Sequence, residues 1–242
     1  MTYCIGIALD KGLVFCSDSR TNAGIDQVST YSKMHVFGIE GERQFVLLSA
    51  GNLATTQAVV HQLRHDIRTA GERSLMTVQN LAEAADYIGE VSLKRQARYL
   101  EGGQSTFDPK VTFIFGGQIA GEAPGIYLIY PEGNYITTSR DHPFLQIGES
   151  KYGKPILDRV ITPGTSIEEA AKCAIVSMDS TVRSNLSVGP PIELRVYETD
   201  TYMTGRYLKF EEDAPYLRQL ARSWNQKVIE AFAALPDIQW AG

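Results

Sequence analysis

The sequence predicts an α+β fold in which two antiparallel β-sheets are covered by helices. In each half of the chain, short strand-like segments follow one another and are joined by Gly-containing turns, which is typical of antiparallel sheets. Longer segments with helical spacing come after these strands as blocks, whereas a parallel sheet would alternate strand and helix. No linker or repeat divides residues 1–242, so we expect a single domain. The pattern alone leaves the order of the layers open.

The first half opens with a predicted β-hairpin. The strands TYCIGIAL (2–9) and LVFCSDS (13–19) flank the turn DKG, in which Gly12 supplies a permissive backbone. A further strand is expected over about 28–38, and the apolar run QFVLLSA leads to Gly51. Asn52 is placed to cap a helix whose apolar positions are Leu53, Val60, Leu63 and Ile67. A second helix is expected to carry one apolar face of Val78, Leu81, Ala85, Ile88 and Val91.

The second half repeats this order. VTFIFGGQI, GIYLIYP and NYITTS are separated by turn residues and predict a three-stranded meander. FLQIG leads into a short helix that begins near Ser150, and Ser166 with Glu169 forms a capping-box signature for a helix through about Val182. IELRVYET and TYMTGRYLKF predict two more strands, followed by an amphipathic helix from about Ala214.

Composition excludes several classes of protein. The net charge of −5 provides no basic surface of the kind that nucleic-acid binding requires. No segment approaches the roughly 20 consecutive apolar residues of a membrane span. The N-terminus lacks the basic segment of a secretory signal, so we expect a cytoplasmic protein. Cys4, Cys16 and Cys173 have no CxxC spacing, and we expect neither a disulfide framework nor a zinc site nor a cofactor.

Thr2 is the first candidate for chemistry. Methionine before a small residue is the usual substrate of methionine aminopeptidase, so removal of Met1 would give Thr2 a free α-amino group. An α-amine has a pKa of about 7.7–8.0, and its neutral form can take the proton from the threonine hydroxyl, directly or through a water molecule. A threonine at position 2 indicates little by itself, and the surrounding residues decide its meaning.

Three further residues give Thr2 such a context. The predicted hairpin places Asp18 close to residues 2–4, because paired strands lie about 4.8 Å apart. Lys33, in the strand that follows, would lower the pKa of the threonine hydroxyl while Asp18 pairs with its ammonium. Gly51 lies between a strand and a helix, where its N–H is expected among the unpaired donors of the helix N-terminus and would form an oxyanion hole. Singly, Asp18 is better explained as a turn residue and Lys33 as a solvated strand residue, whereas Thr2, Asp18 and Lys33 together favour a site.

The segment HQLRH also resembles a metal-binding motif. His61 and His65 lie one helical turn apart, as the two zinc ligands of HExxH do, but Gln62 replaces the glutamate that acts as general base. Glutamine cannot accept that proton, so we interpret the pair as an exposed helix face and predict no metal site.

Taken together, TYCIGIALDKGLVFCSDSRTNAG, SKMHVF and LLSAGNLATTQ resemble the start of a proteasome β-subunit. SDSRTNAG, KMHVF, IGESKYGKPILDR and RSNLSVGPPIEL are similar to the Anbu family, the bacterial ancestral β-subunit homologues of the proteasome. The resemblance spans essentially the whole chain. It implies the four-layer αββα sandwich of the N-terminal-nucleophile (Ntn) hydrolases and a threonine-type endopeptidase that hydrolyses peptide or amide bonds.

The resemblance also assigns roles to residues. Thr2 would be both nucleophile and base, Asp18 and Lys33 the pair that tunes it, and Gly51 the oxyanion donor. Ser150 falls at the family's supporting glycine–serine motif, to within one or two residues. Ser187 matches a serine that orients the threonine amine. Ser184 departs from the family, because conventional β-subunits have an aspartate there, and Asp179 is expected on the preceding helix and does not replace it.

A substrate pocket is implied beside the nucleophile. The family's primary pocket maps loosely onto Thr21, Tyr31, His35, Ser49 and Leu53. This lining is mixed in character and predicts no single type of substrate residue, and ordinary packing explains each position equally well.

Three functions therefore remain open. The leading hypothesis is a self-assembling threonine peptidase, a homo-oligomer in rings or a helical ring, that acts on peptides or unfolded proteins. The second is an Ntn amidohydrolase that acts on a small metabolite in a closed pocket. The third is a proteasome-like assembly or binding protein with little activity, which the replacement at Ser184 favours.

Overall fold

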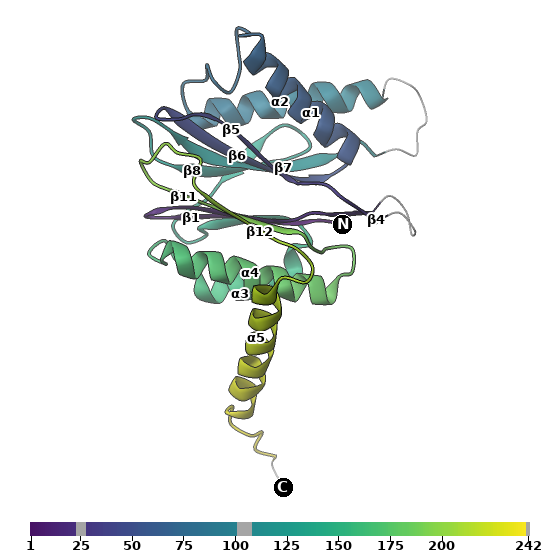
Figure 1. Ribbon diagram of the computed structural model, residues 1–242, viewed down its shortest axis with the longest axis vertical. Coiled ribbons are helices and arrows are strands. Elements are labelled where there is room, and N and C mark those ends of the chain that lie inside the picture. Colours follow the sequence, from purple (N-terminus) through teal and green to yellow (C-terminus); the bar gives the residue numbers. More distant parts are fainter. Residues whose placement is uncertain (23–27, 101–107, 241–242) are drawn as a thin grey trace.

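Two five-stranded antiparallel sheets lie face to face at the centre of the protein, and two helices cover the outer face of each (Figure 1). The structure is a computed structural model that describes residues 1–22, 28–100 and 108–240. Its layers, from top to bottom in Figure 1, are helices, sheet, sheet and helices. This arrangement confirms the predicted αββα fold.

The lower sheet has the strand order β10-β1-β2-β11-β12 and therefore joins strands from both ends of the chain. Its strands are β1 (Tyr3–Leu9), β2 (Gly12–Asp18), β10 (Phe144–Gly148), β11 (Ile192–Glu198) and β12 (Arg206–Phe210). The hairpin β1–β2 forms as predicted, with Cys4 opposite Ser17. This register places Tyr3 beside Asp18, at the end of the hairpin where the chain begins.

The upper sheet is a continuous meander in the order β5-β6-β7-β8-β9. Its strands are β5 (Met34–Ile39), β6 (Arg43–Gly51), β7 (Val111–Ile119), β8 (Gly125–Ile129) and β9 (Tyr135–Thr137). The three strands predicted after residue 110 are therefore confirmed as neighbours.

The strand predicted over 28–38 is wrong in one respect, because it is interrupted. β4 (Val28–Thr30) pairs with β3 (Arg20–Asn22) in a separate ribbon, and β5 begins only at Met34. The Ser32 hydroxyl donates to the Met34 carbonyl and accepts from the Met34 N–H, at 3.0 and 3.3 Å. Such local side-chain bonds compete with a strand ladder. Lys33 consequently lies in a break between two strands and not within one.

Helices α1 (Leu53–Arg68) and α2 (Leu81–Leu100) cover the upper sheet, and α3 (Ser150–Val160) and α4 (Ile167–Ser184) cover the lower one (Figure 1). Asn52 caps α1 by accepting from the Thr55 N–H, and α4 begins with the predicted capping box. Val78 is buried but precedes α2, because the Asn80 side chain accepts the Glu83 N–H and so caps the helix after that point.

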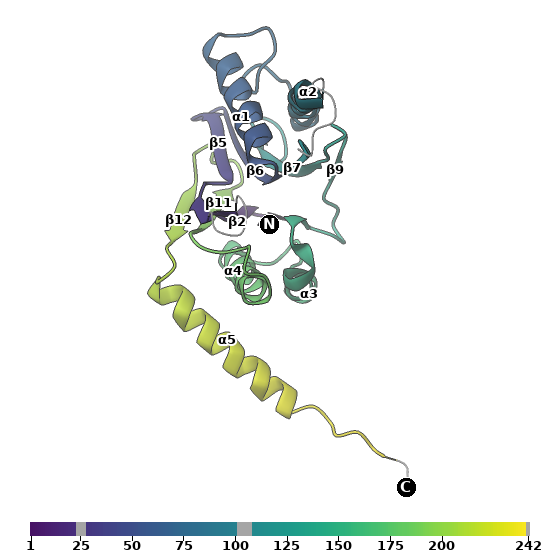
Figure 2. The ribbon, with the colours of Figure 1, turned by 90° about the vertical axis from the view of Figure 1, so that its right-hand side faces the viewer.

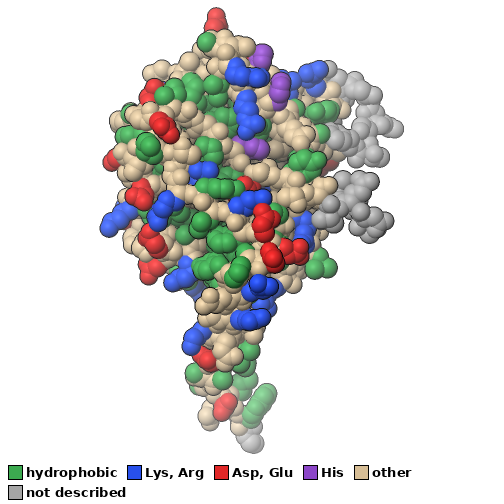
Figure 3. Space-filling view, in the orientation of Figure 1, with side chains coloured by type: hydrophobic (Ala, Val, Ile, Leu, Met, Phe, Trp, Pro, Cys, Tyr) green, Lys and Arg blue, Asp and Glu red, His purple; other side chains and the backbone are tan. Residues whose placement is uncertain are grey.

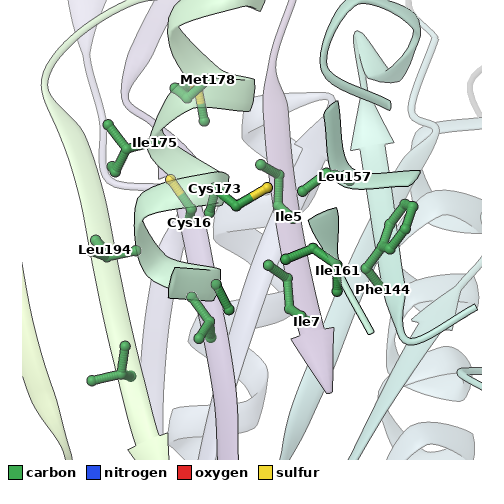
Figure 4. Packing of buried hydrophobic residues seen from close by; sticks show 14 of the residues in the cluster. Ile5, Ile7, Cys16, Phe144, Leu157, Ile161, Cys173, Ile175, Met178 and Leu194 are labelled. Atoms are coloured by element: carbon green, nitrogen blue, oxygen red, sulfur yellow. The ribbon is translucent and has the colours of Figure 1, made fainter. Parts of the chain in front are cut away.

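Three apolar clusters fill the spaces between the layers. One lies between the lower sheet and its helices, where Ile5, Leu157 and Cys173 converge (Figure 4). A second lies between the upper sheet and its helices, and the third between the two sheets. All three cysteines are buried and free, and they pack as small apolar residues.

The predicted C-terminal helix is present as α5 (Pro215–Ala233), but it packs poorly against its own chain. None of its residues is buried, and it extends away from the lower helices (Figures 1 and 2). Within the described residues, no helix has the length and apolar character that crossing a membrane requires.

The core makes a testable prediction about stability. Leu63 of α1 is fully buried, so Leu63→Ala removes packed methyl groups and leaves a cavity, which lowers the free energy of unfolding by about 2–5 kcal/mol. Leu186 is 85% exposed, and we expect Leu186→Ala to change the same quantity by less than about 0.5 kcal/mol. Chemical denaturation of both variants measures this, and equal effects would contradict the described packing of α1.

Candidate active site

A buried ion pair lies at the edge of the sandwich where the chain begins. Asp18, the last residue of β2, is fully buried, and the Lys33 ammonium donates to its Oδ1 at 2.7 Å. The Tyr3 N–H donates to the same oxygen at 3.0 Å, and the Gly189 N–H donates to Oδ2 at 3.2 Å. Burial raises the pKa of Asp18, while Lys33 and the two N–H groups oppose that shift because they stabilise the carboxylate.

Lys33 is held at two points. Besides its bond to Asp18, its ammonium donates to the Arg20 carbonyl at 2.7 Å, and the residue is only 7% exposed. Its own carbonyl accepts the Ser49 N–H at 3.1 Å. These contacts fix both the backbone and the ammonium of Lys33. The positive charge therefore occupies one position beside the start of β1.

Thr2 immediately precedes β1 and is half-buried. Its carbonyl accepts the Glu149 N–H at 2.8 Å. Gly148 packs so closely against it that a Cβ at position 148 would lie 1.9 Å from the Thr2 carbonyl oxygen, and Gly148 has a positive φ of 82°. Met1 is 62% exposed. Both Met1 and Thr2 line a cavity of about 930 Å³ that Lys33 and Gly51 also line.

Gly51 is placed differently from the prediction. It is the last residue of β6 and precedes the capping residue of α1, so its N–H is not one of the first-turn donors of that helix. The Asn52 N–H bonds to Lys110 on the β7 side, and the Ser49 N–H bonds to Lys33 on the β5 side. Because successive strand residues alternate in direction, the Gly51 N–H points to the β5 side, where β5 has not yet begun.

That position still suits an oxyanion donor, for a different reason from the one predicted. Strand β6 carries Gly51 past the break around Lys33, and Gly51 lines the same cavity as Thr2. Gly51 has a positive φ of 118°, and a Cβ there would lie 2.5 Å from the Lys110 carbonyl oxygen. Only glycine fits this backbone position.

The five predicted pocket residues all line this cavity. They are Thr21, Tyr31, His35, Ser49 and Leu53. His35 is mostly buried, and burial, followed by the nearby Arg64 guanidinium, lowers its pKa to about 4. Its Nε2 is buried without a hydrogen-bond partner among the described residues. The cavity continues along α1, where Gln57, His61, Arg64 and Arg68 form a wall that the sequence reasoning did not identify.

The two predicted supporting serines are close in sequence to residues of the site but, within the described chain, do not line the cavity. Ser150 is the first residue of α3, and Ser187 lies in the loop after α4, where its N–H donates to the Asn185 side chain at 2.9 Å. Neither is among the described residues that line the cavity. The neighbouring glycines make the close contacts instead, Gly148 with Thr2 and Gly189 with Asp18.

The position where conventional β-subunits have an aspartate is exposed. Ser184 ends α4 at the surface, and Asp179, about one and a half turns earlier, pairs with Arg183 at 3.1 Å. Asp179 therefore lies on the helix, as predicted, and does not take the missing role.

His61 and His65 are both exposed on α1, with stacked rings whose centroids are 6.5 Å apart. Over the described ranges, no set of three His, Cys, Asp or Glu side chains is arranged to hold a metal ion. His61 instead borders the cavity.

Comparisons with known proteins agree with this fold. A family model described as "Proteasome subunit" matches residues 2–197. The structure is similar to Anbu (ancestral beta-subunit) from Yersinia bercovieri, with 43% identity, a TM-score of 0.93, and coverage of 99% of this chain and 100% of that one. It is equally similar to a structure described as "Helical Assembly of the Anbu Complex" from Pseudomonas aeruginosa, with 45% identity, a TM-score of 0.93 and 98% of both chains covered.

A more distant relative is a proteasome subunit beta from Haloquadratum walsbyi. It is 25% identical over 217 residues, which is 87% of this chain and 79% of that protein. The family model and the extent of both structural matches leave one assignment: the chain belongs to the proteasome-subunit family and, within it, to the Anbu (ancestral β-subunit) proteins.

Proposed function

We propose that this protein is a threonine-type hydrolase, in which Thr2 becomes an N-terminal nucleophile after removal of Met1 and cleaves peptide or amide bonds. The observation that carries the proposal is the buried Asp18–Lys33 pair. It lies beside Thr2, because the N–H of the next residue, Tyr3, donates to Asp18. Burying two charges is costly, and a purely structural site is often as stable with apolar residues. A charged pair beside a possible nucleophile has a clear chemical use.

The proposed chemistry assigns one task to each group. The α-amine of Thr2 takes the hydroxyl proton, and the Lys33 ammonium stabilises the developing alkoxide. The oxygen attacks the substrate carbonyl, and the Gly51 N–H donates to the resulting oxyanion. The protonated amine then transfers its proton to the leaving amine, which leaves an ester on Thr2. Attack by water, with the α-amine again as base, hydrolyses the ester and regenerates the enzyme.

The size of the cavity favours a peptide over a small metabolite. At about 930 Å³ it lies near the upper end of the range for ligand pockets, which is roughly 300–1,000 Å³. A closed site for a small amide would need less room. The third alternative, a binding protein with little activity, draws on the exposed Ser184, since the amine then lacks the carboxylate that supports it in conventional β-subunits.

We also propose that the chain acts as a homo-oligomer in the cytoplasm. The similar P. aeruginosa protein is described as a helical assembly. In this chain, α5 buries none of its residues, although Val228, Ile229 and Phe232 are large and apolar. An isolated amphipathic helix is marginally stable in water. Contact with a second copy of the chain would bury this face.

One prediction from this proposal concerns the nucleophile. Intact mass should show that Met1 is absent from active protein, because Met1 is exposed and precedes a small residue. A threonine-directed electrophile such as a peptide epoxyketone should add one mass equivalent to the wild type and none to Thr2→Ala. Retention of Met1 in protein that is still labelled would exclude the proposed mechanism, and a properly folded, processed protein that is never labelled would favour the binding-protein alternative.

Another prediction separates the chemical role of the ion pair from its structural role. Lys33→Met leaves Asp18 charged and buried without its partner, so we expect a loss of about 3–5 kcal/mol in the free energy of unfolding. The rate of electrophile labelling should fall by about a hundredfold or more, since the charge that stabilises the alkoxide is gone.

The double variant Asp18→Asn/Lys33→Met is the matched control. It contains no unpaired charge, and the introduced asparagine side chain would keep an oxygen that accepts from Tyr3. We expect much of the stability to return while labelling stays slow. Recovery of labelling together with stability would assign the pair a structural role only.

A further inference from the structure

The cavity beside Thr2 is cationic, although the chain as a whole carries a net charge of −5. Among the described residues that line it are four basic side chains, Arg20, Lys33, Arg64 and Arg68, and no aspartate or glutamate. In a cleft with low-dielectric walls, charges of one sign reinforce one another and attract ions of the opposite sign. The lining is therefore selective by charge.

Two of these cations are already engaged. Lys33 is paired with Asp18 at 2.7 Å. Arg20 donates to the Leu186 carbonyl at 2.8 Å and lies 4.0 Å from Glu212. Arg64 and Arg68 have neither an ion pair nor a hydrogen bond to the described parts of the chain, and the Arg64 guanidinium lies 6.0 Å from the centre of the Phe37 ring. Their charge remains free for a ligand.

The free cations lie on one stripe of α1. Gln57, His61, Arg64 and Arg68 are spaced by four, three and four residues, which places them on one side of the helix. The opposite side of α1 buries Val59 and Leu63 against the upper sheet. Figure 3 shows Lys, Arg and His side chains gathered over α1 on this face of the molecule.

His35 adds an uncharged polar side chain to the lining of the same cavity. Its pKa of about 4 keeps the imidazole uncharged at neutral pH, and a neutral imidazole has one N–H. Its Nε2 is buried and has no partner among the described residues, so the ring has unused hydrogen-bonding capacity. The small residues Ser49, Ala50 and Gly51 also line the cavity.

From these observations we propose that the cavity selects acidic peptides, binding an aspartate or glutamate side chain of the substrate through the Arg64 and Arg68 guanidinium groups. The inference rests on the proposed function, and it adds the class of substrate. A carboxylate can accept two N–H groups of one guanidinium, which makes this the strongest match that a side chain offers. A lysine or arginine of the substrate meets like charge, and a neutral side chain leaves the two cations unpaired.

The test uses pairs of peptide electrophiles that differ at one position, which is glutamate in one peptide and glutamine in the other. Each position upstream of the reacting group is varied in turn. At one or more positions, we expect wild-type Thr2 to be labelled about fivefold faster by the glutamate probe, since a partly exposed ion pair contributes modestly. Added salt should reduce this ratio. A ratio of one at every position, or a preference for lysine, would overturn the inference.

Substitutions then locate the selectivity. The double variant Arg64→Gln/Arg68→Gln should bring the glutamate-to-glutamine ratio close to one, whereas Arg64→Lys should retain most of it. Arg140→Gln is the matched control, because Arg140 is 83% exposed and lies outside the described lining of the cavity. A ratio that survives the double variant would overturn the assignment to α1.

A binding measurement distinguishes failure of this inference from failure of the proposed function. Calorimetry with Thr2→Ala compares the affinities of the glutamate and glutamine peptides without any reaction. If no electrophile labels the wild type but the glutamate peptide binds about fivefold more tightly, the charge selection stands and the hydrolase proposal fails. If labelling occurs but neither the labelling rates nor the calorimetric affinities differ between the glutamate and glutamine peptides, the hydrolase proposal stands and the acidic-peptide inference fails.

Discussion

At one edge of the sandwich, the Lys33 ammonium crosses from the segment before β5 to Asp18 at the end of β2, and so connects the two sheets through a buried ion pair. Such a pair is stabilised when further hydrogen bonds satisfy the remaining lone pairs and protons. Here Tyr3, Gly189 and the Arg20 carbonyl supply those partners. The pair therefore constrains the positions of four separate segments of the chain.

The constraint explains why the first strand begins where it does. Since the Tyr3 N–H is bound to Asp18, β1 starts one residue after Thr2, and Met1 and Thr2 lie at the cavity without a strand partner of their own. The backbone approaches closely on both sides of this point. Gly148 lies so close to the Thr2 carbonyl that position 148 has no room for a side chain. On the other side, the Gly189 N–H donates to Asp18. The glycines thus hold the start of the chain in place.

Local pattern is sufficient to predict the hairpin, the meander and both helix caps, because each of these depends on neighbours in sequence, whereas the order of the layers does not follow from it. Asp18 can be placed near Thr2 for the same reason: a tight hairpin fixes its register. The break at Lys33 is not predicted, because the alternation of apolar and polar residues does not reveal that the Ser32 side chain bonds to the backbone of Met34. The contact between Gly189 and Asp18 joins residues 171 apart, and no local signal reports it. The stripe with Arg64 is visible as helical spacing, but only the fold shows that it faces the cavity.

The two kinds of cation in the cavity follow different physical rules. Lys33 is buried and neutralised by Asp18, so its field is short-ranged and acts mainly on the adjacent start of β1, next to Thr2. Arg64 and Arg68 are exposed to solvent and unpaired within the described chain, so their field extends into the cavity to about a Debye length of roughly 8–10 Å. His35 stays neutral because burial and Arg64 both oppose its protonation, which prevents a further positive charge from adding repulsion. A cation that tunes a nucleophile has to be paired to be stable when buried, and a cation that attracts a substrate has to be unpaired. In this proposal the first task falls to Lys33, in the break before β5, and the second to the arginines of α1.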